Sequence, residues 1–255
     1  MPLPLTVKDI SLAKFQWQPP VPFDGLNADQ ILTNLPGTLV AAASLGGVDK
    51  TVTLSGGGSL HFTADGSVAT VNGNGTAALA YPAGTGKTTG NANFDAVLNG
   101  FSWDGGPKFI NVSNLVVGQR YSIQLFALDN RSAESNRLAN FLDPNDNLDY
   151  SQSFKMGDDV YVVGTFVAAN TNEIIQENLP TSNNGNINAL VIRAVANLPP
   201  SLSMSPAGNS LSLQWSAGTL LEATNLAGPW TTNNNASPQT IVPTAPARFF
   251  RVRQP

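Results

Sequence analysis

The sequence predicts an all-β protein in which a large β-sandwich is followed by a small one. Short runs of alternating apolar and polar residues recur along the chain, and Asp-Gly and Asn-Gly pairs separate several of them. Charged residues make up 12% of the 255 residues, well below the roughly 25% usual in soluble domains. Asn, Thr, Ser and Gly supply the polarity instead, which is typical of strands joined by tight turns.

The most strongly patterned stretch runs from Gly118 to Ser132 and reads as a turn, a long strand and a polar loop that opens at Asp129. Its side chains alternate between two faces, with Tyr121, Ile123, Leu125 and Ala127 on one and Ser122, Gln124, Phe126 and Leu128 on the other. We therefore expect a buried central strand. Residues 131–153 are expected to form a long polar loop at one edge of the sheet.

The other elements of the large sandwich follow in order. Asn27 can cap a short helix that Pro36 and Gly37 bring to an end, and a helical turn at 93–100 closes at its terminal glycine. Turn residues separate the remaining runs. Strands are expected at 8–17, 38–44, 51–54, 60–63, 68–71, 109–112, 160–168 and 188–195.

A break in this pattern divides the chain. Residues 197–200, Asn-Leu-Pro-Pro, read as a linker because two prolines stiffen the backbone and block strand pairing. We therefore expect a first domain at 1–196 and a second at 201–255. The second contains short strands at regular spacing, which favours a small sandwich, and about 55 residues are few for a stable core.

Composition and charge exclude several classes of protein. The net charge is −4 and basic residues are scattered, so no nucleic-acid partner is expected. No apolar run approaches the ~18 residues of a membrane-spanning helix, which predicts no membrane insertion. The start, Met1 to Thr6, lacks the basic and apolar regions of a signal peptide. Either the chain is cytosolic or its leader has been replaced, and the composition favours the second, an extracellular or cell-surface protein.

One segment carries oxygen ligands at alternate positions, which suits a hard cation such as Ca²⁺. The candidate metal ligands are Asp143, Asn145, Asn147 and Asp149. The segment is not an EF-hand loop, since Leu148 stands at the sixth position, where glycine is required. A structural calcium ion is the one cofactor that the sequence suggests, and the alternative is a solvated turn rich in Asp and Asn.

Two further motifs carry little chemistry. Residues 84–88, Gly-Thr-Gly-Lys-Thr, look like the end of a phosphate-binding loop, but Tyr81 stands where the first glycine of that motif belongs. His61 is the only histidine and Cys is absent, which excludes a structural zinc site built from these ligands. We expect a glycine-rich surface loop at 84–88 and an exposed strand residue at His61.

A carbohydrate site would use an aromatic plane against the apolar face of a sugar, with Asp, Asn and Arg bonding the hydroxyl groups. Such residues occur beside the Gly105-Gly106 turn and around the 129–153 loop. The alternative is that the aromatic residues serve packing and that the loop covers no ligand. The candidate ligand-binding residues are Trp103, Asp104, Asp129, Asn130, Arg131, Phe141 and Tyr150.

Several segments resemble a known module. Residues 89–100, 110–126, 161–168 and 188–193 are similar to a jelly-roll, galactose-binding-like β-sandwich of secreted and surface proteins from verrucomicrobial and planctomycete-type bacteria. Residues 213–253 resemble a small C-terminal β-module of such proteins. The resemblance implies a jelly-roll sandwich with carbohydrate binding as its commonest role, and it assigns no ligand residue.

The sequence therefore predicts a non-catalytic, extracellular, lectin-like protein whose partner is a glycan or polysaccharide. One alternative is a structural or adhesive surface protein that forms a homo-oligomer or larger assembly. Another is a polysaccharide-active glycoside hydrolase or lyase, for which hydrolysis needs two acids about 5–10 Å apart. No spacing in the sequence pairs the available acids, which are Asp104, Asp129, Asp143, Asp158 and Asp159.

Overall fold

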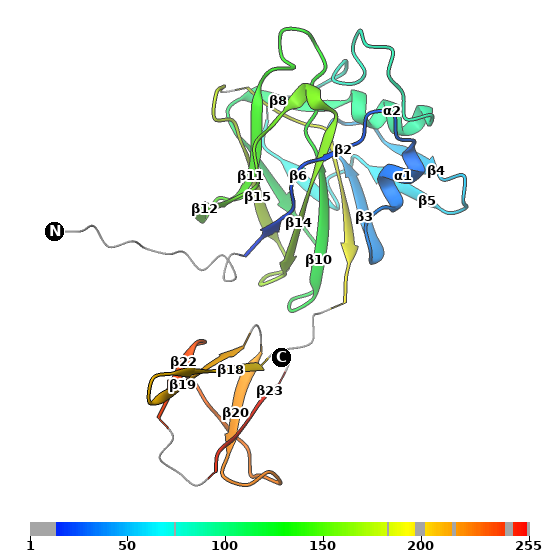
Figure 1. Ribbon diagram of the computed structural model, residues 1–255. Helices are drawn as coiled ribbons and strands as arrows, with labels where there is room; N and C mark the ends of the chain where they lie inside the picture. Colours follow the sequence, from blue (N-terminus) through cyan, green and yellow to red (C-terminus); the bar gives the residue numbers. More distant parts are fainter. Residues whose placement is uncertain are drawn as a thin grey trace, which may run out of the picture. The chain divides into compact units, whose positions relative to one another are not determined.

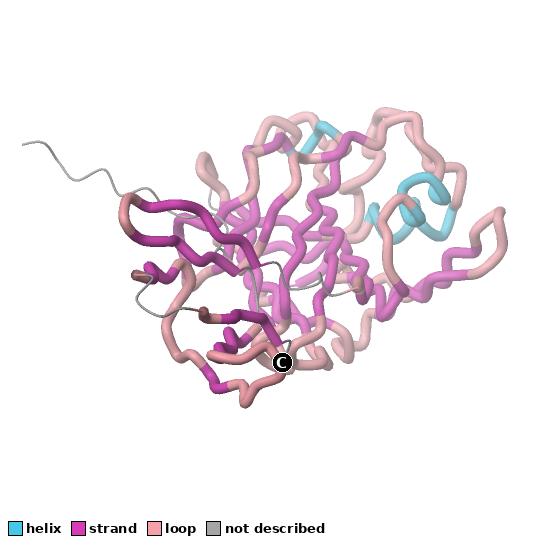
Figure 2. Tube along the Cα trace, turned by 60° about the horizontal axis from the view of Figure 1, so that its bottom comes forward, coloured by secondary structure: helices cyan, strands magenta, loops and turns pink. Residues whose placement is uncertain are grey.

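The computed structural model describes residues 14–73, 75–182, 184–196, 202–215, 218–242 and 247–253. The chain divides into two compact units, Met1–Ala196 and Asn197–Pro255. Strands make up 47% of the structure and helices 8%, which confirms the all-β prediction (Figures 1 and 2). No helix in the described residues is long and apolar enough to cross a membrane.

The first unit is built on a large sheet with β10 near its centre. All its pairs are antiparallel except β3 with β5, and β2 (Val21–Pro22) adds to the end of β14. The strand order is β1 (Gln16–Trp17), β14 (Val160–Val167), β10 (Arg120–Phe126), β17 (Ala189–Ala194), β3 (Thr38–Ser44), β5 (Ser59–Thr63) and β4 (Lys50–Thr53).

A second sheet packs against one face of the large sheet. Ile123 and Leu125 of β10 meet Ile110 and Phe141 of the second sheet in a shared core, and all four side chains are fully buried. Its strand order is β12 (Asp146–Tyr150), β11 (Leu138–Asp143), β15 (Glu173–Asn178), β9 (Lys108–Val112) and β6 (Ala69–Val71), and β13 (Phe154–Lys155) also pairs with β11. This is the sandwich that the sequence predicts.

Two helices cover the other face of the large sheet (Figure 1). Helix α1 (Ala28–Thr33) begins at Asn27, whose side chain accepts the Gln30 N–H in a capping box, as the sequence predicts. Helix α2 (Ala92–Asn99) ends at Gly100, and its apolar residues reach the same core as Phe126. Both faces of β10 are therefore buried, which explains why apolar residues occur on both sides of that strand.

A third sheet of the first unit, the short sheet, has β8 (Phe101–Gly105) between β16 (Asn184–Ile187) and β7 (Gly75–Ala77). Ile187 points into the core between the two larger sheets. Because side chains alternate along a strand, Trp103 and Asn186 lie on the opposite face. The short sheet thus presents one face to the core and the other outward.

The prediction of a long loop at 131–153 was wrong. Residues 138–143 and 146–150 form the antiparallel β11–β12 hairpin, and β13 follows before the 3₁₀ turn at Met156–Asp158. Polar side chains in this region pair with partners distant in sequence, and Asp149, for example, accepts the backbone N–H of Phe15. The expected strand at 8–17 is described only from residue 14, and the expected linker at 197–200 lies outside the described residues.

The second unit has two sheets around its own small core. One contains β18 (Leu202–Ala207), β19 (Ser210–Trp215) and β22 (Gln239–Ile241), and the other contains β21 (Thr231–Thr232), β20 (Thr219–Ala223) and β23 (Phe249–Arg253). Leu213, Leu220 and Ile241 are buried between them. The predicted small sandwich is therefore present.

Candidate functional site

The outward face of the short sheet forms the floor of a cavity of about 290 Å³. Trp103 stands directly opposite Gly75 on one neighbouring strand and opposite Asn186 on the other. Its side chain is 46% exposed, although it lies in a strand. The indole lies over Gly75, since its Nε1 is 3.7 Å from where a Cβ of that residue would stand, which is an ordinary van der Waals distance. The floor thus offers an aromatic plane beside an amide.

Residues 131–137, which we call the wall segment, close one side of this cavity. Glu134 and Ser135 both donate backbone N–H bonds to the Arg131 carbonyl, at 2.9 Å each, so the segment is a tight turn. The turn is anchored from outside, because Gly157 donates its N–H to the Ser135 carbonyl at 2.9 Å. Its lining side chains are Arg131, Glu134 and Arg137.

Two neighbouring groups, the Asp129 carboxylate and the Phe101 ring, hold Arg131 in place. Its Nε and Nη2 donate to the two carboxylate oxygens of Asp129 at 2.8 and 2.5 Å, in the bidentate geometry typical of strong Arg–carboxylate pairs. Its guanidinium lies 5.1 Å from the ring centroid of Phe101. The hydrogen bonds that Arg131 donates to Asp129 raise the pKa of Arg131, so the guanidinium stays charged. Its remaining N–H groups are available to a ligand in the cavity.

The far end of the wall segment carries a second ion pair. Arg137 pairs with Glu134, three residues earlier, and its Nη1 donates to the Asn184 carbonyl at 2.9 Å. This bond joins the wall segment to β16 at the edge of the floor. Among the described residues that line the cavity, Glu134 is the one carboxylate.

A buried carboxyl group lies behind the floor. Glu177 of β15 is fully buried opposite Lys108 of β9, and it accepts the backbone N–H of Asn186 at 3.1 Å. Burial raises the pKa of Glu177 to about 8, although that hydrogen bond and Lys108 act in the opposite direction. Gly185 lies between the Glu177 carboxyl group and the cavity. The two residues are in close contact, because a Cβ at Gly185 would lie 2.9 Å from Glu177 Oε2.

The structure brings three of the predicted ligand-binding residues together. Trp103 and Arg131 line the cavity, and Asp129 lies fully buried behind Arg131. Asn130 is buried beside them, but its Nδ2 donates to Asp159 Oδ1 at 2.8 Å, away from the lining. The side chain of Asp104 lies outside what the structure describes.

The two other predicted aromatic residues lie elsewhere. Phe141 is fully buried between the sheets and stacks against Trp17 and Phe154, so it cannot touch a ligand. That part of the prediction was wrong because residue 141 belongs to β11 and not to a loop. Tyr150 is 58% exposed on the edge strand β12 and is not among the lining residues.

Two of the candidate calcium ligands, Asp143 and Asp149, make protein contacts, and the side chain of Asn147 lies outside what the structure describes. Asp143 accepts the Asn145 N–H at 2.9 Å, which is the hydrogen bond of an Asx turn, and the Lys14 ammonium lies 3.9 Å from its other oxygen. Asp149 accepts the Phe15 N–H at 2.9 Å. Within the described residues, no group of three His, Cys, Asp or Glu side chains is arranged to hold a metal. These contacts favour the turn over the calcium site.

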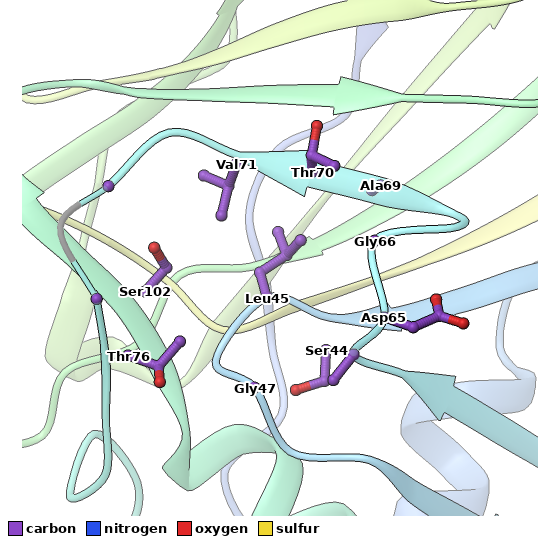
Figure 3. Close-up of a pocket in the computed structure, with 13 residues that line it drawn as sticks. Ser44, Leu45, Gly47, Asp65, Gly66, Ala69, Thr70, Val71, Thr76 and Ser102 are labelled. Atoms are coloured by element: carbon purple, nitrogen blue, oxygen red, sulfur yellow. The ribbon is translucent and has the colours of Figure 1, made fainter.

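A second cavity, of about 320 Å³, lies near the other face of the short sheet (Figure 3). Ser102 and Thr76 line it, and they face away from Trp103 because they occupy the alternate positions of β8 and β7. The one carboxylate among its described lining residues belongs to Asp65. This carboxylate accepts hydrogen bonds from Ser67, which lower the pKa of Asp65 to about 2. No aromatic or basic side chain is among its lining residues, so it offers less to a ligand.

The remaining motifs are structural. Lys87, the lysine of the glycine-rich segment, pairs with Asp159 and with Asp24. Lys87 therefore holds this loop against the residue that precedes β14. Its ammonium group is paired within the protein and is not placed to bind a phosphate. His61 is exposed on β5 beside Thr51, whose hydroxyl lies 3.1 Å from the ring Nδ1, as expected for a strand residue facing solvent.

Sequence reasoning missed several lining residues, of which Glu134, Arg137 and Asn186 matter most. The first two lay within the segment predicted as a loop, so nothing fixed their direction. The sequence does contain a pattern that points to Asn186. Asparagines at 184, 186 and 188 alternate with Gly185 and Ile187 immediately before a strongly apolar strand. That alternation indicates a strand with one polar face.

Comparison with known proteins adds little. No protein-family model matches the chain, and no curated protein matches it. Among solved structures it is similar to the adhesin domain of Epf from Streptococcus pyogenes, with 14% identity and a TM-score of 0.21. The match covers 56% of this chain and 60% of that one. A TM-score this low does not indicate a shared fold, so nothing about this chain follows from it.

Proposed function

We propose that the first unit binds a carbohydrate in the cavity between the short sheet and the wall segment. The observation that carries this proposal is the exposed Trp103 ring on a strand, in the same cavity as the fixed guanidinium of Arg131. A sugar ring stacks its apolar face on such a plane, while guanidinium and amide groups bond its hydroxyl groups. The resemblance of the sequence to galactose-binding-like modules implies the same role.

We further propose that binding is not followed by catalysis. Hydrolysis of a glycosidic bond uses a pair of carboxyl groups that flank it. Glu134 is the single carboxylate in the lining, and it is paired with Arg137. Glu177 has a raised pKa, as a general acid would, but it is fully buried behind Gly185. The cavity geometry therefore favours retention of a sugar over its cleavage.

A glycan array tests this proposal directly. Wild-type protein is expected to bind at least one class of neutral glycan, and Trp103→Ala is expected to lose about tenfold or more in affinity. The matched control is Phe109→Ala, because Phe109 is a 40% exposed strand aromatic that does not line the cavity. The proposal fails if wild-type protein binds no glycan, or if both variants bind equally well.

The proposed location is extracellular or at the cell surface, where such polymers are common. The support is compositional, since neutral polar residues replace charged ones over most of the chain. Digestion of intact cells with an added protease is expected to remove the protein. Full protection from protease in intact cells, with degradation only after lysis, would contradict this location.

A second candidate function, self-assembly of a structural or adhesive protein, has one observation in its favour. All six residues of β18 are exposed, the strand carries no charge, and it pairs only with β19 among the described strands, so its first four residues, before Pro206, offer an open edge. Uncharged edge strands can accept a strand from another chain. The edge strands β4 and β12 of the first unit carry Lys50 and Asp146, which oppose such pairing.

Sedimentation velocity over a range of concentrations separates this candidate from a monomer. Assembly through β18 predicts a larger species that Met204→Lys reduces, because Met204 is 53% exposed in the middle of that strand. Thr51→Lys on the edge strand β4 of the first unit is the matched control. A monomer at every concentration would remove the candidate.

A further inference from the structure

Asn186 presents a buried acceptor to the cavity. Its side chain is 1% exposed, and its Nδ2 donates to the Leu128 carbonyl at 2.9 Å and to Asp129 Oδ2 at 3.1 Å. Both partners can only accept, so the amide has one orientation. Its Oδ1 has no hydrogen-bond partner among the described residues, although Asn186 lines the cavity.

The position of Asn186 suits a role in recognition. It stands directly opposite Trp103 in the β8–β16 ladder, and side chains at such positions have Cβ atoms about 4.5–5.5 Å apart on the same face. A sugar ring stacked on the indole would therefore bring a hydroxyl group within reach of Oδ1. Oδ1 is buried and has no partner among the described residues, so a hydroxyl group that donates to it would supply the hydrogen bond that the free protein lacks.

The charges around the cavity cancel. Arg131 is neutralised by Asp129 and Arg137 by Glu134, so two arginines and two carboxylates sum to zero. Among the described lining residues, an acidic sugar would meet guanidinium groups that are already paired with carboxylates, and Glu134 would repel it. The cavity of about 290 Å³ is just smaller than the roughly 300–1,000 Å³ usual for ligand sites, which suits one sugar ring and not a chain segment.

We infer that the cavity takes a single uncharged sugar unit whose hydroxyl donates to Asn186 Oδ1, and that Asn186 determines which sugar is accepted. This inference rests on the proposed carbohydrate binding and specifies its ligand class. A sugar that lacks the donating hydroxyl leaves a buried acceptor unpaired, which is the kind of loss that gives strong discrimination.

Calorimetric titration of the full-length protein with matched sugars tests the ligand class. The probes are the methyl glycosides of glucose, galactose, mannose and N-acetylglucosamine, with glucuronic and galacturonic acid as charged counterparts of the first two. At least one neutral glycoside is expected to bind, and each uronic acid is expected to bind at least about tenfold more weakly than its neutral partner. A uronic acid that binds as well as or better than its neutral partner overturns the inference. If no sugar binds, the proposed function itself fails.

Monodeoxy derivatives of the best neutral glycoside test the role of Asn186. Removal of one particular hydroxyl is expected to weaken binding to wild-type protein by about tenfold to a hundredfold. The same removal is expected to change binding to Asn186→Ala by less than about twofold, because the acceptor is gone. The wild-type series alone stays decisive if that variant does not fold. Equal, small losses at every hydroxyl would overturn the assignment.

Discussion

Asp129 shows how one buried carboxylate organises the cavity. Its oxygens accept hydrogen bonds from Arg131 and from the amide of Asn186, so it holds one group of the wall segment and one of the floor. It is fully buried, whereas the Arg131 side chain is 38% exposed. The ion pair is therefore asymmetric, and its two residues should respond differently to substitution.

Substitution of Arg131 is expected to destabilise the protein. Arg131→Ala leaves the Asp129 carboxylate buried without its main partner, which should lower the free energy of unfolding by about 1–3 kcal/mol in urea denaturation. The double variant Asp129→Asn with Arg131→Ala removes the stranded charge and should recover part of this loss. A double variant less stable than Arg131→Ala would show that the carboxylate is not the source of the loss.

Glu177 predicts a pH dependence of stability. Its pKa is about 8 in the folded protein and 4.5 as a free side chain, so between these values the folded state binds more protons than the unfolded state. The contribution of Glu177 to the stability of the folded protein is fully present below pH 4.5 and is lost as the pH rises through 8. The free energy of unfolding should therefore fall across this window, by at most about 1.4 kcal/mol per pH unit.

Comparison with Glu177→Gln isolates this group from the other carboxylates. The glutamine side chain cannot ionise, so urea denaturation at several values between pH 5 and pH 9 should give a flatter dependence for the variant. At pH 8 the variant should be at least as stable as the wild type. Identical slopes for the two proteins would mean that Glu177 does not titrate in this window.

At the scale of single elements, the short sheet depends on close approach at Gly185. A Cβ there would lie 2.6 Å from the Gly106 carbonyl oxygen, which is backbone and cannot turn aside. Gly185→Ala should therefore push β16 away from its neighbours and cost about 1–3 kcal/mol in thermal or urea unfolding. Sugar binding should weaken as well, because Asn186 follows in the same strand.

Gly56→Ala is the matched control for this substitution. Nothing lies within 4 Å of the Cβ that would be added at Gly56, in the turn between β4 and β5. The free energy of unfolding of the Gly56→Ala variant should stay within about 0.5 kcal/mol of the wild-type value, as for most surface substitutions. If Gly185→Ala were equally harmless, the tight contact with the Gly106 carbonyl would not be a constraint in solution.

The elements that could be predicted from sequence are those whose pattern is local. Residues 38–44 and 160–167 carry strand patterns that can be seen in the segments themselves, and both were expected as strands. The β11–β12 hairpin was not expected, because Asn140 and Asp149 are polar yet buried. Their partners, Asn178 and the N–H of Phe15, lie 38 and 134 positions away, beyond the reach of any local pattern.

The same limit applies to the cavity. The types of Trp103 and Arg131 suggested a sugar site, and both residues line one cavity. Asn186 was missed because its importance comes from the register that places it opposite Trp103. The register between two strands depends on how segments distant in sequence pair. No short segment of the sequence shows that pairing.

At the scale of the whole molecule, each unit buries a core of its own. Among the described residues, the cores of the first unit extend to Ile192 and the partly buried Ala194, and the core of the second begins at Leu213. Three fully buried apolar side chains form a small core for a unit of this size. The two units should therefore unfold separately, the second at the lower temperature.

Differential scanning calorimetry checks this expectation. Full-length protein should show two transitions, and a chain that ends at Ala196 should keep only the upper one, with its midpoint changed by less than about 2 °C. Sugar binding should survive the truncation, because every lining residue belongs to the first unit. A large fall in the remaining midpoint would show that the second unit stabilises the first.

The exposed indole on the floor of the cavity has a practical consequence. Trp17, Trp215 and Trp230 are each partly buried, whereas Trp103 is the one exposed tryptophan in the described structure. A ring stacked on Trp103 would exchange water around that chromophore for sugar, and its fluorescence emission would move to shorter wavelength. The molecule thus carries its own optical reporter, which would follow occupancy of the cavity without a dye or a label.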